Sequence, residues 1–204
     1  MNDRITTLIL AGGRSSRMGQ DKASLKLGKN SVLENLLETA FQISGHAVVM
    51  RAPEQQHLSI KKELRDKITI GFDQIEGEGP LKGIADSLPH LPQQSDRIFV
   101  ITCDLPFLSI LWLDALNNAL TEEYDVVCTE TGNITNALLA IYRPQVLKIA
   151  PKILLEGKRR PVDLLKGWRV KKLPPMHDFQ IEVKDMNTPL EYEKAKLQFL
   201  KSND

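Results

Sequence analysis

The sequence predicts an α/β protein: a three-layer α/β/α sandwich around a mainly parallel, Rossmann-like sheet. Short apolar segments of strand length alternate with segments of helical periodicity along the chain. Such alternation is typical of βαβ units, whose helices cover both faces of a parallel sheet. Glycines or carboxylates directly follow several of the apolar segments, and in such sheets ligands bind beyond the carboxyl ends of the strands.

The expected strands are short runs rich in β-branched and aliphatic side chains. The first run ends at a pair of glycines, and the fourth is the most apolar segment of the chain. Nearly continuous apolar runs of this length are typical of strands that are buried on both faces. Strands are predicted at residues 5–10, 47–50, 68–72, 98–103, 125–128 and 137–142.

The expected helices lie between these strands. Residues 32–43 place their apolar side chains on one face at helical spacing. Pro80 stands at the start of a helix over residues 81–88, where its missing N–H removes no hydrogen bond. Further helices are predicted at residues 55–67 and 108–120, from about residue 145, and from about residue 189 to the end.

Length and composition indicate an ordinary globular protein. The 204 residues are expected to form a single domain, residues 1–204. Hydrophobic residues make up 42% of the chain and charged residues 26%, which are ordinary values for a globular protein. The net charge is only +1, from 27 basic and 26 acidic residues. Nucleic-acid binders usually carry a basic excess, so no nucleic-acid partner is expected.

A membrane partner is not expected either. The long apolar stretch "IFVITCDLPFLSILWL" is interrupted by Asp104 and Pro106, so it does not predict a transmembrane helix. The first ten residues lack the layout of a signal peptide. Cys103 and Cys128 lie in apolar runs and are expected to be buried thiols, not a disulfide or metal ligands. These observations favour a cytoplasmic protein.

The segment "LAGGRSSRMGQDK", residues 10–22, predicts a phosphate-binding loop. Its glycines and cations are Gly12, Gly13, Gly19, Arg14, Arg17 and Lys22. Glycines let backbone amides approach a ligand closely, and successive inward amides bind anions. The alternative is a flexible surface loop with solvated charges. The spacing excludes a Walker A loop, and it also excludes the dinucleotide fingerprint.

Carboxylates follow other predicted strands. Asp73 comes directly after residues 68–72, and Asp104 follows the fourth strand in the sequence "CDLP". Asp185 and Asn187 lie near the end of the chain in "VKDMNTP". Asp73 could instead form a turn, and Asp185 could be an ordinary exposed carboxylate. An apolar core would reject polar groups at these strand ends, and ligands bind outside the carboxyl ends of strands in such folds, so these residues are candidates for a ligand site.

The segment at residues 10–22 resembles the signature L-A-x-G-x-S-x-R-M-G-x-x-K of small nucleotidyltransferases. Its doublet Gly12-Gly13 is similar to that of the molybdenum cofactor guanylyltransferases of the MobA-like family, whereas cytidylyltransferase relatives have alanine in place of the first glycine. The resemblance implies a fold of the nucleotide-diphospho-sugar transferase type. It continues through "GPLKGI" at 79–84, "TCDLPFL" at 102–108, "GKRRPVDLL" at 157–165 and "DMNTPLEYEKA" at 185–195.

The resemblance implies a reaction. The phosphate of molybdopterin attacks the α-phosphorus of GTP in the presence of Mg²⁺, giving molybdopterin guanine dinucleotide and pyrophosphate. GTP and molybdopterin are then the substrates, and other proteins of cofactor biosynthesis are candidate partners. Two alternatives stay open. One is nucleotidyl transfer from CTP or to a sugar or polyol phosphate, and the other is a non-catalytic nucleotide-binding protein.

The resemblance also implies the roles of individual residues. Arg17 and Lys22 are the expected catalytic cations. The expected nucleotide-binding residues are Leu10, Ala11, Gly12, Gly13, Lys22, Asp73 and Asp104. Asp104 and Asp185 are the expected ligands of the metal, and the expected acceptor-binding residues are Arg159, Arg160 and Asn187.

The chain departs from the family pattern at several positions. Relatives often have asparagine at the end of the second strand, where this chain has Met50, Arg51 and Ala52. They usually have alanine where this chain has Lys82. Gly12 is expected to face the base and to leave room for a purine.

Overall fold

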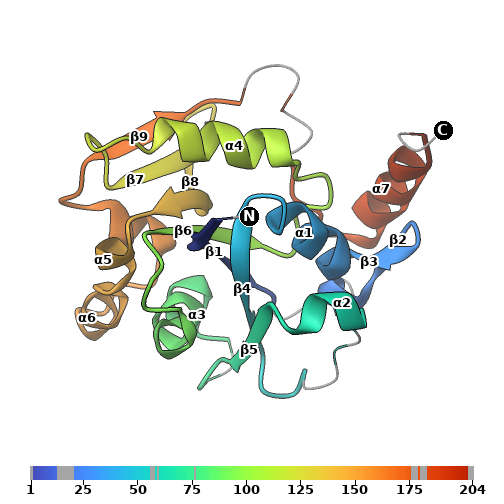
Figure 1. The fold of residues 1–204 in the computed structure, drawn as a ribbon, viewed down its shortest axis with the longest axis horizontal. Helices are drawn as coiled ribbons and strands as arrows, with labels where there is room; N and C mark the ends of the chain where they lie inside the picture. The colour runs from blue at the N-terminus through green and yellow to red at the C-terminus, as the bar shows by residue number, and fades with distance from the viewer. Residues whose placement is uncertain are drawn as a thin grey trace.

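The structure is a computed structural model, and it describes residues 2–12, 21–55, 58, 60–75, 77–175, 179 and 183–201. A central sheet crosses the molecule, and helices lie on both sides of it (Figure 1). On one side α1 and α4 pack against the sheet, and on the other side α3, α5 and α6 do so. Helix α7 contacts the hairpin that precedes α1 and contributes Ala195 to the core beneath α1 and α4. This is the predicted three-layer α/β/α sandwich.

The large sheet has the strand order β5-β4-β1-β6-β8-β7-β9. Parallel pairing joins β1 to β4 and to β6, β4 to β5, and β7 to β9. Strand β8 runs antiparallel to both of its neighbours, β6 and β7. The strands of this sheet are β1 Asn2–Leu10, β4 Ser44–Arg51, β5 Ile68–Phe72, β6 Arg97–Thr102, β7 Val126–Thr131, β8 Ile134–Tyr142 and β9 Val170–Leu173.

Successive residues of the central strands enter two separate cores, because side chains alternate between the faces of a sheet. Ile9 and Phe99 belong to the core beneath α1 and α4. Leu8 and Val100 belong to the core beneath α3 and α6. The α-helices are α1 Val32–Ala40, α2 Lys62–Arg65, α3 Pro80–Ser87, α4 Ile110–Ala119, α5 Pro144–Leu147, α6 Ala150–Leu155 and α7 Pro189–Lys201.

Short elements complete the description. A two-stranded antiparallel hairpin, β2 Lys26–Leu27 with β3 Asn30–Ser31, precedes α1. The 3₁₀ helices are η1 Lys22–Ser24, η2 Leu88–His90 and η3 Pro161–Leu165. The hairpin and β9 were not predicted from the sequence.

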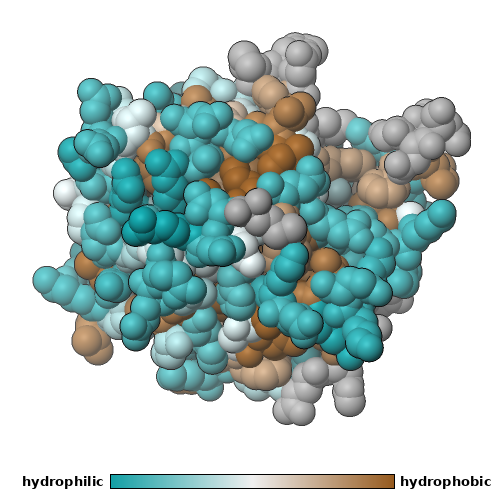
Figure 2. Space-filling model, in the orientation of Figure 1, coloured by the Kyte–Doolittle hydropathy of each residue, from teal (hydrophilic) through white to brown (hydrophobic). Residues whose placement is uncertain are grey.

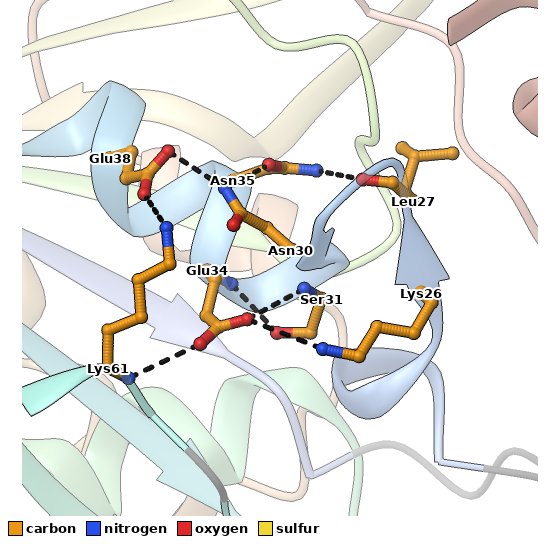
Figure 3. Close-up of polar contacts among 8 residues, drawn as sticks. All are labelled: Lys26, Leu27, Asn30, Ser31, Glu34, Asn35, Glu38 and Lys61. Carbon is orange, nitrogen blue, oxygen red and sulfur yellow. Dashed lines mark hydrogen bonds and ion pairs between the residues drawn. The ribbon is translucent and has the colours of Figure 1, made fainter. Parts of the chain in front are cut away.

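The start of α1 is held by a capping box (Figure 3). The backbone N–H of Glu34 donates to the Ser31 hydroxyl at 3.2 Å, and the Glu34 carboxylate accepts from the backbone N–H of Ser31 at 2.8 Å. The second carboxylate oxygen of Glu34 accepts from the backbone N–H of Lys61 at 3.3 Å. The carboxylate therefore joins α1 to the chain just before α2.

The prediction of a helix over residues 55–67 is wrong in length, since α2 covers only Lys62–Arg65. The backbone N–H of Gln55 closes a turn onto the carbonyl of Ala52, and Ile60 is buried ahead of the helix. The backbone of Lys61 is not helical, and no side chain caps the helix there. The charge pattern alone predicts that the residues before Lys62 are helical. In the structure, the described part of this segment instead forms a turn and a non-helical stretch, and Lys61 contacts α1 there.

Charged and polar residues dominate the face of the molecule seen in Figure 2, with smaller apolar areas between them. Cys103 and Cys128 are free and buried, as predicted. Within the described part of the chain, no helix combines the length and the apolar content that crossing a bilayer requires.

Candidate active site

A cavity of about 390 Å³ lies at the carboxyl ends of β1 and β6. This is the point of the sheet where the chain connections turn in opposite directions, which is where α/β sheets bind ligands. The volume is in the range of small-molecule sites. The lining residues are Leu10, Ala11, Gly12, Asp21, Lys22, Met50, Asp73, Gly77, Gly79, Pro80, Gly83, Thr102, Cys103, Asp104 and Leu138.

The first wall of the cavity is the chain that leaves β1. The backbone N–H of Ala11 donates to the carbonyl of Met50 at 2.8 Å, and the carbonyl of Leu10 accepts from Cys103 at 3.2 Å. Pairing with both neighbouring strands therefore continues to the edge of the cavity. A Cβ on Gly12 would lie 2.6 Å from Asp73 Oδ2 and 2.8 Å from the Ala52 nitrogen.

The geometry at Gly12 corrects the reason that the sequence suggested for this glycine. The sequence suggested that the missing side chain leaves room for a purine. In the structure, the position of a Cβ is instead next to protein atoms of Asp73, Ala52 and Arg51.

We expect Gly12→Ala to lower the free energy of unfolding by about 1–3 kcal/mol, because the extra methyl forces the backbone or Asp73 to move. It should also weaken GTP and CTP binding alike. Urea denaturation and calorimetric titration measure both effects. Unchanged stability together with a shift of preference toward CTP would contradict this explanation.

Lys22 is held at the edge of the cavity by two local devices. Asp21 is the N-cap of η1, and its carboxylate accepts from the backbone N–H of Ala23 at 3.2 Å and from the Ser24 hydroxyl at 2.8 Å. Lys22 Nζ donates to Asn187 Oδ1 at 2.6 Å. The cation is thereby placed between the segment after β1 and the segment before α7.

The segment before α7 is ordered by the helix cap that follows it. The backbone N–H groups of Asn187 and Thr188 both donate to Glu191 Oε2 at 2.8 Å, and the N–H of Glu191 donates to Thr188 Oγ1 at 3.2 Å. This reciprocal bonding is a capping box. Asn187 Nδ2 donates in turn to Asp185 Oδ2 at 2.6 Å. One amide side chain therefore links Lys22 to Asp185.

Asp104 occupies the floor of the site at the end of β6. The Thr102 hydroxyl donates to Asp104 Oδ1 at 2.5 Å, and the Asp104 carbonyl accepts from the backbone N–H of Met186 at 2.8 Å. Burial raises the pKa of Asp104, while the hydrogen bond from Thr102 and the charge of Lys22 oppose the rise. The charge of Asp185 adds to the rise in pKa, so Lys22 and both carboxylates share one electrostatic environment.

The donor set at Asp104 fits a magnesium ion that is bound together with its substrate. In the described residues, no group of three or more His, Cys, Asp or Glu side chains is arranged to hold a metal by itself. Mg²⁺ is commonly held by one or two carboxylates, with substrate phosphates and waters as the remaining ligands. Asp104, with Asp185 beside it, supplies that number of carboxylates.

Asp73 lies opposite, at the end of β5. Its backbone N–H donates to the carbonyl of Arg51 at 2.8 Å. Its Oδ1 is buried, and among the described residues that oxygen has no hydrogen-bond partner. Burial raises the pKa of Asp73 to about 6, with repulsion from Asp86 adding to the rise and Lys82 opposing it. Within the described residues, this carboxylate oxygen therefore has an unused acceptor position that faces the cavity lining.

Lys82 and Asp86 support this carboxylate from α3. Lys82 Nζ forms an ion pair with Asp86, and both side chains are mostly buried. The second oxygen of Asp86 accepts from the backbone N–H of Gln74 at 2.9 Å, which fixes the chain just after Asp73. The departure from the family pattern at Lys82 thus has a structural role beside the cavity.

Comparison with known sequences identifies the family, because residues 7–171 match the model of the MobA-like NTP transferase domain. The chain belongs to the MobA-like NTP transferase family. It is therefore a nucleotidyltransferase, and the fold and the resemblance predicted from its sequence are confirmed. All residues that line the cavity lie within the matched portion, whereas Asp185 and Asn187 lie beyond its end.

The relatives of this MobA-like chain agree with that assignment. A probable molybdenum cofactor guanylyltransferase of Carboxydothermus hydrogenoformans is 30% identical over 93% of this chain and 94% of its own length. A protein of the same name from Bacillus mycoides is 28% identical over 92% of this chain and 94% of its own length.

Solved structures show the same fold. Molybdopterin-guanine dinucleotide biosynthesis protein A of Archaeoglobus fulgidus superposes with a TM-score of 0.75, at 22% identity over 96% of this chain and 99% of its own. A 4-diphosphocytidyl-2C-methyl-D-erythritol synthase of Anaerococcus prevotii gives 0.74, at 15% identity over 96% of each chain. The fold is therefore shared both with that biosynthesis protein and with that synthase.

The cavity brings together many of the residues predicted from the sequence. Leu10, Ala11, Gly12, Lys22, Asp73 and Asp104 line it. Gly13 and Arg17 lie outside the described residues. Asp185 and Asn187 are joined to the site through Lys22 and Asp104, although they do not appear in its lining.

The predicted acceptor-binding arginines do not line the cavity. Arg159 is exposed, and its guanidinium donates to the carbonyls of Leu154 and Lys158 at 2.9 Å. The guanidinium of Arg160 is exposed and lies 3.9 Å from the Asp163 carboxylate. Each arginine is thus engaged with its own surroundings on α6 and η3, and an acceptor role for them stays a prediction.

Several lining residues were missed by the sequence analysis. Asp21 lies within the quoted segment of residues 10–22, but no local pattern indicates its ion pair with Arg51, which is 30 residues away in the sequence. Thr102 precedes Asp104 by two residues, which is the signal that could have revealed its hydrogen bond. Met50 and Leu138 reach the cavity from β4 and β8 and carry no polar signal. Their place depends on strand order, which no local pattern contains.

Proposed function

We propose that the chain transfers GMP from GTP to molybdopterin in a magnesium-dependent reaction. An oxygen of the molybdopterin phosphate bonds to the α-phosphorus, the bond to the β-phosphate breaks, and pyrophosphate leaves. The products are molybdopterin guanine dinucleotide and pyrophosphate. The observation that carries the proposal is the placing of Lys22 and Asp104 at one cavity of a MobA-like chain. The names of the relatives support the choice of substrates.

The cation and the carboxylate have complementary tasks. Lys22 neutralises charge on the triphosphate and stabilises the negative charge that moves onto the leaving pyrophosphate. Asp104 would hold Mg²⁺ together with phosphate oxygens, with Asp185 as the second carboxylate. The bound metal would supply further charge neutralisation. Phosphoryl chemistry of this type needs mainly positioning and electrostatic stabilisation from the protein.

Asp73 is suited to hold the nucleotide at a donor group. Its buried Oδ1 is an acceptor without a partner among the described residues, and leaving such a group unpaired costs free energy. An N–H group of guanine would satisfy it. An ionised carboxylate only accepts hydrogen bonds, so the protonation state of Asp73 should affect binding.

GTP affinity is expected to rise as pH increases through about 6, because the pKa of Asp73 lies at about 6 and ionisation provides the acceptor. Asp73→Asn should remove this dependence and bind GTP more weakly at pH 7.5. Calorimetric titration of both proteins across this range checks it. The comparison also cancels the titration of the γ-phosphate. Parallel pH profiles for the two proteins would exclude Asp73 as the titrating group.

The same residue has an effect on stability whose sign is opposite to the usual case for aspartate. The folded pKa of Asp73 is raised above its ordinary value of 3.8. The folded state therefore retains the proton that the unfolded chain loses, and stability falls as pH rises from about 4 to about 6. Asp73→Asn should lose this dependence in denaturation measured across that interval.

The test of the reaction is direct. Purified protein is mixed with Mg²⁺, molybdopterin and either GTP or CTP, and both pyrophosphate and the dinucleotide product are measured. We expect product with GTP and little with CTP. Product with CTP alone would assign a cytidylyltransferase. Binding of GTP without pyrophosphate release would favour a non-catalytic nucleotide-binding protein.

A further inference from the structure

Among the described residues, a second cation near the cavity is almost completely buried: Arg51, at the end of β4. The side chain of Arg51 is 1% exposed. Its guanidinium donates to both oxygens of Asp21, with Nη2 to Oδ2 at 2.7 Å and Nη1 to Oδ1 at 3.3 Å. The carbonyl of Gln55 accepts from Nε at 3.4 Å and from Nη2 at 3.3 Å. A guanidinium paired in this two-pronged way is fixed in geometry as well as charge.

Asp21 faces the place where an anion would bind. It lines the cavity with Lys22, its neighbour in sequence, and its side chain is 24% exposed. An unpaired carboxylate there would repel a triphosphate. Burial alone would raise the pKa of Asp21, but hydrogen bonds from Arg51 and Ser24 outweigh it and keep the pKa low. Asp21 is therefore ionised, and Arg51 compensates its charge.

The pair also joins two distant parts of the site. Asp21 caps η1, the short helix that begins at Lys22. Arg51 belongs to β4, which pairs with β1 up to the edge of the cavity. The bond thus anchors the chain immediately before Lys22 to the rigid central sheet. Asp73 is anchored to the same residue, because its backbone N–H donates to the Arg51 carbonyl.

We propose that Arg51 and Asp21 form a positioning pair for the nucleoside triphosphate. Arg51 neutralises the carboxylate on the cavity wall and, through Asp21, holds Lys22 where the phosphates bind. The proposal rests on the function proposed above, in that it takes the cavity to bind a nucleoside triphosphate. It assigns to Arg51 no direct contact with the reacting atoms.

The charge argument makes a prediction that a purely structural role does not. Arg51→Met leaves Asp21 unpaired and facing the phosphates, and like-charge juxtaposition of this kind should weaken GTP binding by about 10- to 100-fold. Binding of guanosine, which has no phosphate, should be unchanged. Adding Asp21→Asn to Arg51→Met removes the repelling charge, so the double variant should recover much of the GTP affinity.

Asp21→Asn alone separates positioning from repulsion. Asparagine still caps η1 well, and no carboxylate then faces the phosphates, so GTP affinity should be retained. The anchor of Lys22 is weakened, and small displacements of a catalytic group can lower the rate by up to about 100-fold. We therefore expect kcat to fall while the KM for GTP stays near the wild-type value.

The experiment measures GTP binding by calorimetry and guanosine binding by saturation-transfer NMR for the wild type, the two single variants and the double variant. The matched control is Arg169→Met, which breaks another two-pronged pair, with Asp125, at the edge of the sheet formed by β7 and β9. It should leave both ligands unaffected. Melting temperatures identify any variant that does not fold.

Two outcomes would overturn the proposal. One is an equal loss of GTP and guanosine binding in Arg51→Met, and the other is a double variant that binds GTP as weakly as Arg51→Met. If Arg51→Met does not fold, Arg51→Lys keeps the charge without the two-pronged geometry, and unchanged kcat and KM in that variant would overturn positioning. A wild-type protein that does not bind GTP would instead contradict the proposed function.

Discussion

Lys22→Ala is expected to lower kcat by about 10²–10³-fold, the loss typical of removing one preorganised group that stabilises developing charge. The structure supports this because Lys22 lines the cavity and its ammonium is held by Asn187 at 2.6 Å. Stability should change little, since the side chain contributes a contact at the edge of the site and none to the apolar cores. The measurement is turnover at saturating GTP and molybdopterin.

A nearby lysine provides the control for this variant. The Lys26 side chain is 69% exposed, lies 4.0 Å from the Glu34 carboxylate and does not line the cavity. Lys26→Ala should therefore keep wild-type turnover. Asn187→Ala, which removes the partner of Lys22 but keeps the cation, should reduce kcat by less than Lys22→Ala. Wild-type turnover in Lys22→Ala would exclude a catalytic role for this lysine.

Asp104→Asn is expected to remove most activity, by about 10³-fold, because charge stabilisation by a bound metal accounts for several kcal/mol of the barrier. The amide keeps the shape of the carboxylate and can still contact Thr102. Higher Mg²⁺ should restore part of the rate, since the defect lies in metal affinity. Activity is measured against Mg²⁺ concentration at fixed GTP.

A carboxylate at the other end of β6 provides the control for Asp104→Asn. Asp96 lies just before β6 and pairs with Arg4 at 2.6 Å, away from the cavity. Asp96→Asn should leave the Mg²⁺ midpoint unchanged. Superimposable Mg²⁺ titrations for the wild type and Asp104→Asn would show that Asp104 is not a metal ligand, whatever the loss of rate.

Local sequence was sufficient for the fold class and for part of the site. The strands that end at Leu10, Phe72 and Thr102 are apolar runs whose ends are marked by glycine or aspartate. Parallel strands bring their carboxyl ends to one edge of a sheet, so Asp73 and Asp104 could be expected near the glycines after β1. The alternation of strand and helix segments and the polar residues after the strands depend only on residues that are close in the sequence. They can therefore be recognised without the structure.

The contacts between residues that are far apart in the sequence could be known only from the tertiary structure. Lys22 and Asn187 are 165 residues apart in the sequence, and their contact follows from the docking of the segment before α7 onto the end of β6. Nothing in the sequence around Arg51 distinguishes it from an exposed arginine, but in the structure its side chain is buried and paired with Asp21. The antiparallel placement of β8 between β6 and β7 and the short extent of α2 likewise depend on packing. The sequence by itself therefore determined most of the strands and helices of the α/β fold and the chemistry at the strand ends. Only the tertiary structure determined which charges compensate one another, because burial and pairing are set by residues far apart in the chain.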